Sequence, residues 1–360
     1  MGYLFALFFL FSSSALFAQS VPTIPYDSVA NAIRLPANLY LGEGTGVAVN
    51  SKKHIFILSR GNVSGPAFGA AAAQLLEFAP DGRFLREIGK NLYAWAFGHT
   101  VRIDREDNIW VTDKGSDMIV KFNAEGRVLM VFGRKQEASE EAVPHKRTPT
   151  PPKHEDGRFR QPTDVTWDPA GNTYISDGYI NSRIAKVDKN GNWVKSWGER
   201  GDKPGEFNTP HTIAADAQGN IYVGDRGNGR IQVFDGDGNF LREIRIKVPF
   251  DPNARPAIGN KPAEDVRGTS APGSPWALCI TPGPRQFLYS ADSYPGRVYK
   301  MSLDGQVVGV FGESGKLLKQ FGWIHEMACP SENELYVAEI LNWRVQKLIL
   351  HPDQRTAATH

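Results

Sequence analysis

The stretch PHTIAADAQGNIYVGD, residues 210–225, decides the fold of this chain. Small and polar residues lead into an apolar strand, a Gly-Asn turn follows, and Ile-Tyr-Val-Gly-Asp forms a second strand. Because glycine accepts the positive φ that tight hairpin turns require, this pattern predicts two antiparallel strands. The same arrangement recurs as GHTVRIDREDNIWVTD at 98–113 and as PTDVTWDPAGNTYISD at 162–177. The chain is therefore built from an internal repeat.

Three looser copies, which begin at Thr45, Pro275 and Ile324, bring the number of repeats to six. Each copy continues into a third strand and usually a fourth, and a four-stranded unit of roughly 45 residues is the size of a propeller blade. We therefore predict an all-β fold, a six-bladed β-propeller of four-stranded antiparallel blades, over residues 21–350. The sixth copy has only three strands, and we expect the N-terminal segment 31–42 to supply its outer strand and close the ring. An open solenoid is the alternative architecture.

The two ends of the chain lie outside the repeats. Residues 1–20 are predicted to be a secretory signal peptide, because their apolar stretch is too short to span a bilayer and small residues follow it. No Lys or Arg precedes that stretch, so an uncleaved membrane anchor is the alternative. We expect a secreted or periplasmic protein without stable membrane insertion after cleavage, and a C-terminal tail at 351–360.

Composition narrows the possible partners and the redox state. Lys plus Arg number 41 against 39 Asp plus Glu, and this balance gives no reason to expect binding to nucleic acid. Cys279 and Cys329 fall in predicted inner strands of neighbouring repeats, where a disulfide and two buried free thiols are both open. Two connectors, 134–158 and 246–274, are rich in proline and charge and long enough to be functional or disordered.

Antiparallel strand order brings three kinds of segment to one mouth of the central channel: the starts of the inner strands, the segments after the second strands, and the long connectors. We call this the upper mouth. Eight histidines in 360 residues predict well under one histidine in six arbitrary positions. We call the position where each inner strand begins its slot. Three of the six slots hold histidine, in alternate blades. In blade order the slot contains Thr45, His99, Thr163, His211, Trp276 and His325.

Three convergent imidazoles with an open fourth position suit a catalytic zinc better than a closed structural site. The alternative is a set of hydrogen-bonded channel histidines without metal. After the second strands come Arg60, Tyr179 and Arg226, which together can hold a carboxylate and move a proton. Lys114 occupies the place that corresponds to Arg226, so some of these positions can instead serve contacts between blades. The aspartates that end the second strands recur too regularly to be catalytic and are predicted to cap turns; they are Asp113, Asp177, Asp225 and Asp292.

The repeats resemble NHL repeats, and several stretches resemble one family more specifically, the peptidyl-α-hydroxyglycine α-amidating lyases. These stretches are GKNLYAWAFGHTVRIDREDNIWVTD, QPTDVTWD with ISDGYINSRI, and FNTPHTIAAD with VGDRGNGRIQVF. The resemblance covers about residues 40–350 and is strongest in blades two to four.

This resemblance implies a zinc ion held by His99, His211 and His325. It implies an active-site tyrosine at Tyr179 and two active-site arginines at Arg60 and Arg226. It also implies a structural calcium ion, bound by the main-chain carbonyls of Val47 and Val101 and by Glu326, where the family has aspartate. A further departure is Trp323, which replaces the family's methionine near the third histidine.

The reaction implied is cleavage of a carbinolamide, in which peptidyl-α-hydroxyglycine yields a peptide amide and glyoxylate. Tyr179 would be the general base, the arginines would hold the carboxylate, and zinc would lower the pKa of the α-hydroxyl. The partner is then a small-molecule or peptide substrate with a free carboxylate. Two alternatives remain: a non-catalytic NHL propeller that binds a peptide, glycan or protein, and a metal-dependent ester or lactone hydrolase.

Overall fold

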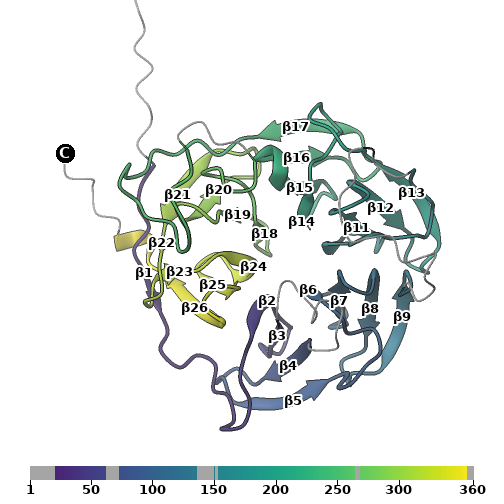
Figure 1. Cartoon of the computed structure of the whole chain (residues 1–360), viewed down its shortest axis with the longest axis horizontal. Coiled ribbons are helices and arrows are strands. Elements are labelled where there is room, and N and C mark those ends of the chain that lie inside the picture. Colours follow the sequence, from purple (N-terminus) through teal and green to yellow (C-terminus); the bar gives the residue numbers. More distant parts are fainter. Residues whose placement is uncertain (1–20, 62–72, 136–149, 151–152, 264–267, 355–360) are drawn as a thin grey trace, which may run out of the picture.

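The computed structural model describes residues 21–61, 73–135, 150, 153–263 and 268–354. In these residues, six four-stranded sheets surround a central axis, as Figure 1 shows. The predicted six-bladed β-propeller is confirmed. The described residues contain no α-helix, only two short 3₁₀ helices, η1 (Arg226–Asn228) and η2 (Pro352–Gln354). The predicted signal peptide, residues 1–20, lies outside the described part of the chain.

Five blades are simple meanders in which the first strand lies nearest the axis and the fourth lies outermost (Figure 1). Blade one contains β2 (Glu43–Val49), β3 (Ile55–Arg60), β4 (Gln74–Phe78) and β5 (Phe84–Ile88). Blade two contains β6 (Gly98–Ile103), β7 (Ile109–Asp113), β8 (Met118–Phe122) and β9 (Val128–Phe132). Blade three contains β10 (Asp164–Trp167), β11 (Thr173–Asp177), β12 (Arg183–Val187) and β13 (Trp193–Trp197). Blade four contains β14 (Pro210–Ala215), β15 (Ile221–Asp225), β16 (Arg230–Phe234) and β17 (Phe240–Ile244). Blade five contains β18 (Ala277–Ile280), β19 (Leu288–Ala291), β20 (Val298–Met301) and β21 (Val307–Phe311).

Blade six closes the ring with strands from both ends of the chain. Its inner three strands are β24 (Ile324–Ser331), β25 (Glu334–Glu339) and β26 (Arg344–Leu350), and its outer strand is β1 (Tyr26–Ser28). Tyr26 pairs with Leu350 in antiparallel register. The expectation that residues 31–42 form this strand was wrong. That segment instead packs its apolar side chains, Ile33 and Leu39 among them, against a cluster shared by blades one and six. A short parallel pair, β22 (Glu313–Ser314) and β23 (Gln320–Phe321), precedes blade six.

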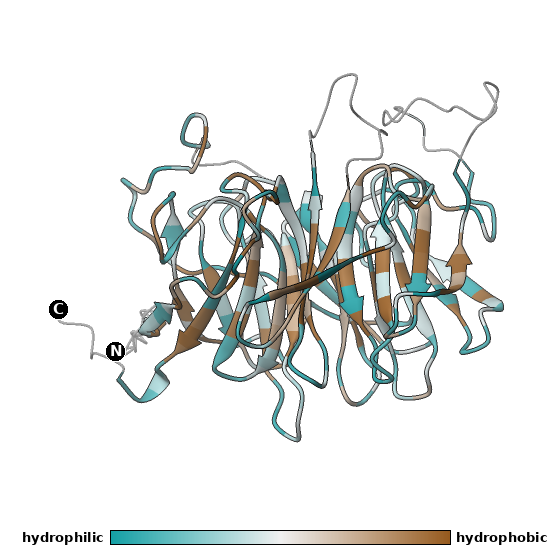
Figure 2. Ribbon diagram, turned by 90° about the horizontal axis from the view of Figure 1, so that it is seen from below, coloured by the Kyte–Doolittle hydropathy of each residue, from teal (hydrophilic) through white to brown (hydrophobic). Residues whose placement is uncertain are grey.

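The hydrophobic core lies between neighbouring blades. Phe56 and Leu58 of blade one pack in one cluster with Val101 and Val111 of blade two, and every one of them is at most 2% exposed. Each such side chain contributes about 1.5–3 kcal/mol through its burial. Second strands such as β7 are buried along their whole length, because a blade covers each of their faces. Figure 2 accordingly shows hydrophobic segments along the strands and hydrophilic segments in the turns.

The prediction that the recurring aspartates cap turns holds for Asp113 and Asp292, whereas Asp177 and Asp225 accept hydrogen bonds from side chains of the turn. All four aspartates also fix the backbone that leads into the inner strands. Asp113 accepts hydrogen bonds from the backbone N–H groups of Gly115 and Ser116 in the turn after β7. It also accepts N–H groups from Ala96 and Phe97, each at 2.9 Å, just before β6. This second role places the start of the inner strand against the end of the second strand.

Cys279 and Cys329 form a disulfide between β18 and β24, the inner strands of blades five and six. The two possibilities left open by the sequence are therefore resolved in favour of the disulfide. Both connectors that the sequence singled out extend in part beyond the described residues. In the second, the carbonyls of Val248 and Pro249 accept hydrogen bonds from Arg297 of blade five. The described part of the chain has no helix that is long and apolar enough to cross a membrane.

Candidate functional site

Three histidines meet on the propeller axis at the upper mouth. His99, His211 and His325 are each the second residue of an inner strand, β6, β14 and β24. Their ring centroids are 4.8 Å (His99–His211), 4.5 Å (His99–His325) and 4.9 Å (His211–His325) apart. None is more than 3% exposed. The structure therefore brings together the three histidines that the alternating slot pattern selected.

There is a structural reason why histidine occupies the slot only in every second blade. Each histidine donates a hydrogen bond through Nδ1 to the main-chain carbonyl of the slot residue in the next blade. The pairs are His99 with Thr163 at 2.7 Å, His211 with Trp276 at 2.8 Å and His325 with Thr45 at 2.8 Å. Because a carbonyl only accepts, Nδ1 must carry the hydrogen in each ring, and the lone pair of Nε2 points toward the axis. Blades two, four and six supply the imidazoles, and blades three, five and one orient them.

These three side chains form a potential metal site. Their candidate ligand atoms lie within 4.8 Å of one another. Burial, together with nearby positive groups, lowers the pKa of each histidine well below its ordinary value, so all three are neutral. Nε2 of His211 is buried without a hydrogen-bond partner. A ring nitrogen held in the acceptor tautomer by a carbonyl on its far side is the arrangement that metal-binding histidines adopt.

Tyr179 lies beside this trio, in the turn after β11. Its hydroxyl is 3.4 Å from Nε2 of His99 and 3.4 Å from a terminal nitrogen of Arg226. Burial raises the pKa of Tyr179, but the positive charges of Arg226, Lys114 and Arg60 outweigh it and lower the pKa to about 8. The phenol can therefore exchange a proton near neutral pH.

The two predicted arginines lie at the same mouth but differ in how many contacts they make with other protein groups. Arg60 is 6% exposed, its Nε donates to Glu43 at 2.8 Å, and its guanidinium lies 3.8 Å from the ring centroid of Phe97. Arg226 stacks on Trp276 at 4.4 Å, and its Nε is buried without a hydrogen-bond partner. Arg226 thus has donor capacity left for an anionic ligand, whereas Arg60 is largely held by the protein.

Two side chains at the site were not selected from the sequence. Nζ of Lys114 lies 3.6 Å from the ring centroid of Tyr179, so this residue faces the site and does not merely join blades. The signal was its place after β7, which corresponds to Arg226 after β15. Glu43, which pairs with Arg60, precedes the recognised repeat and gave no signal. The ring centroid of Trp323 lies 5.2 Å from that of Trp276, and Trp276 in turn lies 5.8 Å from His211.

The predicted calcium ligands adopt a different arrangement. The main-chain N–H groups of Val47 and Val101 both donate to Oε2 of Glu326, at 3.2 and 3.0 Å. Oε1 of the same carboxylate lies 3.0 Å from Nε of Arg102. An arginine therefore faces the carboxylate that was expected to bind calcium, and Oε1 itself accepts no hydrogen bond.

Comparison with known proteins gives a consistent relationship. The NHL repeat family matches residues 207–234. The chain is 34% identical over 332 residues to peptidyl-glycine alpha-amidating monooxygenase A of Xenopus laevis, which covers 84% of this chain and 31% of that protein. It is 27% identical over 286 residues to peptidyl-alpha-hydroxyglycine alpha-amidating lyase 1 of Drosophila melanogaster, covering 74% of this chain and 47% of that protein. The chain is related to the amidating lyases. The resemblance inferred from its motifs is confirmed.

The amidating relatives are longer than the matched region, and the chain spans about a third of the length of the Xenopus monooxygenase. A second kind of relative is NHL repeat-containing protein 3 of Mus musculus, 32% identical over 181 residues, or 46% of each chain. Among solved structures, a streptogramin B lyase superposes with a TM-score of 0.54 at 12% identity, over 91% of this chain and 98% of that chain. At this identity the superposition supports the propeller fold alone.

Proposed function

We propose that this amidating-lyase relative is a zinc-dependent lyase that cleaves a peptidyl-α-hydroxyglycine-like carbinolamide to an amide and glyoxylate. The observation that carries the proposal is the set of three inward-facing Nε2 atoms with the Tyr179 hydroxyl 3.4 Å from one of them. His99, His211 and His325 would hold the zinc, which supplies Lewis acidity and lowers the pKa of a bound hydroxyl.

The side chains of the site suit the proton transfers of this reaction. Tyr179, as phenolate, accepts the proton of the substrate α-hydroxyl at its own oxygen. The O–H electron pair then forms the carbonyl of glyoxylate as the carbon–nitrogen bond breaks, and the nitrogen takes a proton. Tyr179 can return the proton it accepted, so the cleavage consumes no water. A pKa near the working pH favours transfer in both directions.

A free carboxylate is the substrate feature that the cations of the site recognise. Arg226 offers its guanidinium edge, and a planar guanidinium pairs with a carboxylate through two parallel hydrogen bonds. Arg60 and Lys114 add positive charge at the same mouth. The substrate is accordingly a small molecule or peptide that ends in a carboxylate, which departs as part of glyoxylate.

Two other functions are the alternatives. The similarity to NHL repeat-containing protein 3, whose name states no reaction, is compatible with a non-catalytic propeller that binds a peptide, glycan or protein. A metal ion bound by the three histidines would also suit the hydrolysis of an ester or lactone. Elemental analysis distinguishes the non-catalytic binding propeller from the zinc enzyme. About one zinc per chain, lost in His211→Ala, supports the enzyme. A metal-free wild-type protein supports the binding propeller. Glyoxylate release separates the lyase from the hydrolase, which produces an acid and an alcohol.

We also propose that the chain acts in a secreted or periplasmic compartment. The disulfide between Cys279 and Cys329 supports this, since disulfides persist in oxidising environments. Fractionation of cells that express the full chain tests the proposal, and recovery of the protein in the cytoplasm with residues 1–20 retained would contradict it.

A further inference from the structure

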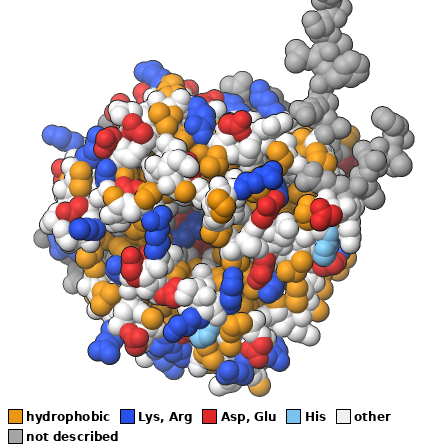
Figure 3. Space-filling model, turned by 180° about the vertical axis from the view of Figure 1, so that it is seen from behind, with side chains coloured by type: hydrophobic (Ala, Val, Ile, Leu, Met, Phe, Trp, Pro, Cys, Tyr) orange, Lys and Arg blue, Asp and Glu red, His pale blue; other side chains and the backbone are white. Residues whose placement is uncertain are grey.

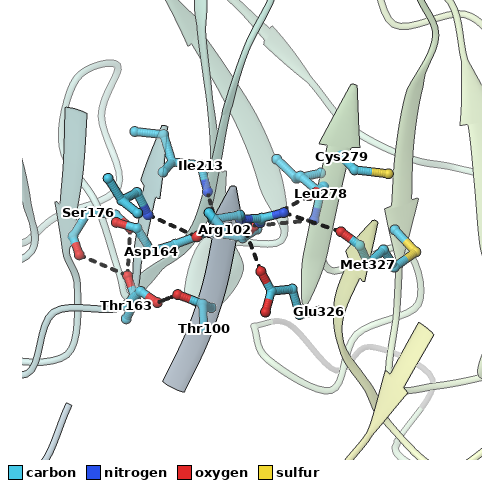
Figure 4. Close-up of polar contacts among 12 residues, drawn as sticks. Thr100, Arg102, Thr163, Asp164, Ser176, Ile213, Leu278, Cys279, Glu326 and Met327 are labelled. Atoms are coloured by element: carbon cyan, nitrogen blue, oxygen red, sulfur yellow. Dashed lines mark hydrogen bonds and ion pairs between the residues drawn. The ribbon is translucent and has the colours of Figure 1, made fainter. Parts of the chain in front are cut away.

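A guanidinium occupies the propeller axis beneath the histidine trio. Arg102, three residues after His99 on β6, donates from Nε and one terminal nitrogen to the carboxylate of Asp164, at 2.9 and 2.6 Å. Its Nε also lies 3.0 Å from Oε1 of Glu326, although its single hydrogen goes to Asp164. Figure 4 shows Arg102 between these two carboxylates. We call the three residues the axial cluster.

The axial cluster joins the inner strands of all six blades. Arg102 of blade two also donates to the carbonyls of Leu278 in blade five and Met327 in blade six, at 3.3 and 3.2 Å. Thr212 of blade four donates to Asp164 of blade three at 2.9 Å. Blade one enters through the N–H group of Val47, which donates to Glu326. One cation and two carboxylates thus lie where the six strands converge.

We propose that Arg102 is the built-in axial cation of this propeller, and that it takes the place of the calcium ion expected at Val47, Val101 and Glu326. Two observations support the exchange. Oε2 of Glu326 accepts two main-chain N–H groups, and Oε1, which accepts no hydrogen bond, lies 3.0 Å from the positive guanidinium of Arg102. Gly46 leaves little free space, since a Cβ there would lie 2.6 Å from Glu326 Oε2. The convergence of the inner strands is therefore independent of calcium.

Arg102 is the member of the axial cluster that is reachable from the lower mouth, where the inner strands end. Arg102 lines a hollow of about 280 Å³ together with apolar residues such as Met327 and Ile213. Figure 3 views this face and shows the hollow at its centre, with Lys or Arg side chains at the base. The side chain of Arg102 is 14% exposed. If Arg102 were shortened, ions from solvent would have a path to the two carboxylates.

The first test measures calcium binding to the zinc-loaded wild-type chain. Titration calorimetry with calcium chloride should give no binding heat from the axial cluster, and the thermal midpoint should not change when calcium is added. One bound calcium per chain, or a midpoint that rises with calcium, overturns the proposal. Because neither readout involves turnover, the result is independent of the reaction that the upper mouth catalyses.

The second test shortens the cation. Arg102→Ser leaves two buried carboxylates without their guanidinium, so the midpoint should fall by roughly 5–10 °C. Added calcium should restore part of that loss. Arg102→Lys keeps a cation and should not respond to calcium, and Arg102→Ser/Glu326→Gln should lose the calcium response. A calcium response equal in Arg102→Ser and Arg102→Lys would contradict the proposal. If Arg102→Ser does not fold, the wild-type titration still decides.

Discussion

At the scale of single residues, the site depends on groups whose protonation is set by their surroundings. A carbonyl on the outer side of each imidazole fixes its tautomer, and burial keeps the ring neutral. Tyr179 shows the opposite balance, because three cations overcome the effect of burial on its pKa. The sequence identified the histidines by their repeated slot. It did not identify Glu43, whose contact with Arg60 depends on a strand that begins before the recognised repeat.

Replacing Tyr179 by phenylalanine removes the proposed proton acceptor and keeps the ring. We expect the rate of glyoxylate release to fall by about 10²–10⁴-fold, the usual contribution of a positioned acid–base group. The zinc content and the thermal midpoint should stay at wild-type values, since the hydroxyl is not among the ligands. Steady-state kinetics with metal analysis checks this. A variant that retains full activity would exclude Tyr179 as the base.

The rate should also depend on pH through Tyr179. A general base acts only when deprotonated, so kcat/KM should rise with pH and level off above a midpoint at or below about 8, since bound zinc lowers this pKa further. Lys114→Met removes one of the cations and should move that midpoint upward by about one unit. Lys121→Met, which alters a lysine stacked on Trp110 away from the site, is the matched control and should leave the profile unchanged. Identical profiles in both variants would contradict the role of Lys114.

At the scale of elements, the inner strand is the unit that the sequence predicts best. The first residues of the inner strand, the turn after it and the aspartate at the end of the second strand all recur, and the structure contains each of them. What the repeat could not reveal is the interaction between blades. The partner of Cys279 in β18 is Cys329 in β24, 50 residues later, and the position of each cysteine alone was compatible with a thiol. Likewise, the sequence gives no sign that Arg102 differs from other strand residues, because its partners lie on the inner strands of other blades.

The disulfide between β18 and β24 should stabilise the propeller by limiting the unfolded chain. We expect Cys279→Ser/Cys329→Ser to lower the free energy of unfolding by about 2–4 kcal/mol, as measured by denaturant titration. Reductant should destabilise the wild type by a similar amount and leave the double variant unchanged. If reductant lowers the free energy of unfolding equally in the wild type and the double variant, the disulfide is not the source of the stabilisation.

At the scale of the whole molecule, the ring is held closed by a strand from the beginning of the chain. The sequence predicted that the N-terminal region would complete blade six, but the prediction named residues 31–42, whereas the strand is β1. The reason is that Tyr26 makes its apolar contacts with residues almost 300 positions away: its ring lies 4.7 Å from Phe311 and 6.4 Å from Phe321. The three residues of β1 contain no sequence pattern from which such distant contacts could be predicted. The apolar residues of 31–42, by contrast, resemble a strand and pack against blades one and six.

Truncating the aromatic side chain of β1 should weaken this closure. We expect Tyr26→Ala to lower the free energy of unfolding by about 2–4 kcal/mol, because it removes packing on two phenylalanines. Tyr40→Ala is the control: Tyr40 is 78% exposed, and its loss should change stability by less than about 0.5 kcal/mol. Denaturant unfolding of both variants measures the difference. Equal stability of the two variants would show that the packing of Tyr26 does not stabilise the closure.

The central claim is that the histidine trio and its neighbours at the upper mouth form a lyase site, and glyoxylate release from α-hydroxyhippurate tests it most directly. The zinc-loaded chain should convert this carbinolamide to benzamide and glyoxylate in equal amounts, well above the rate without protein. Activity should be lost in His211→Ala together with the metal. A chain that binds one zinc per molecule and yet releases glyoxylate no faster than buffer alone would contradict the account.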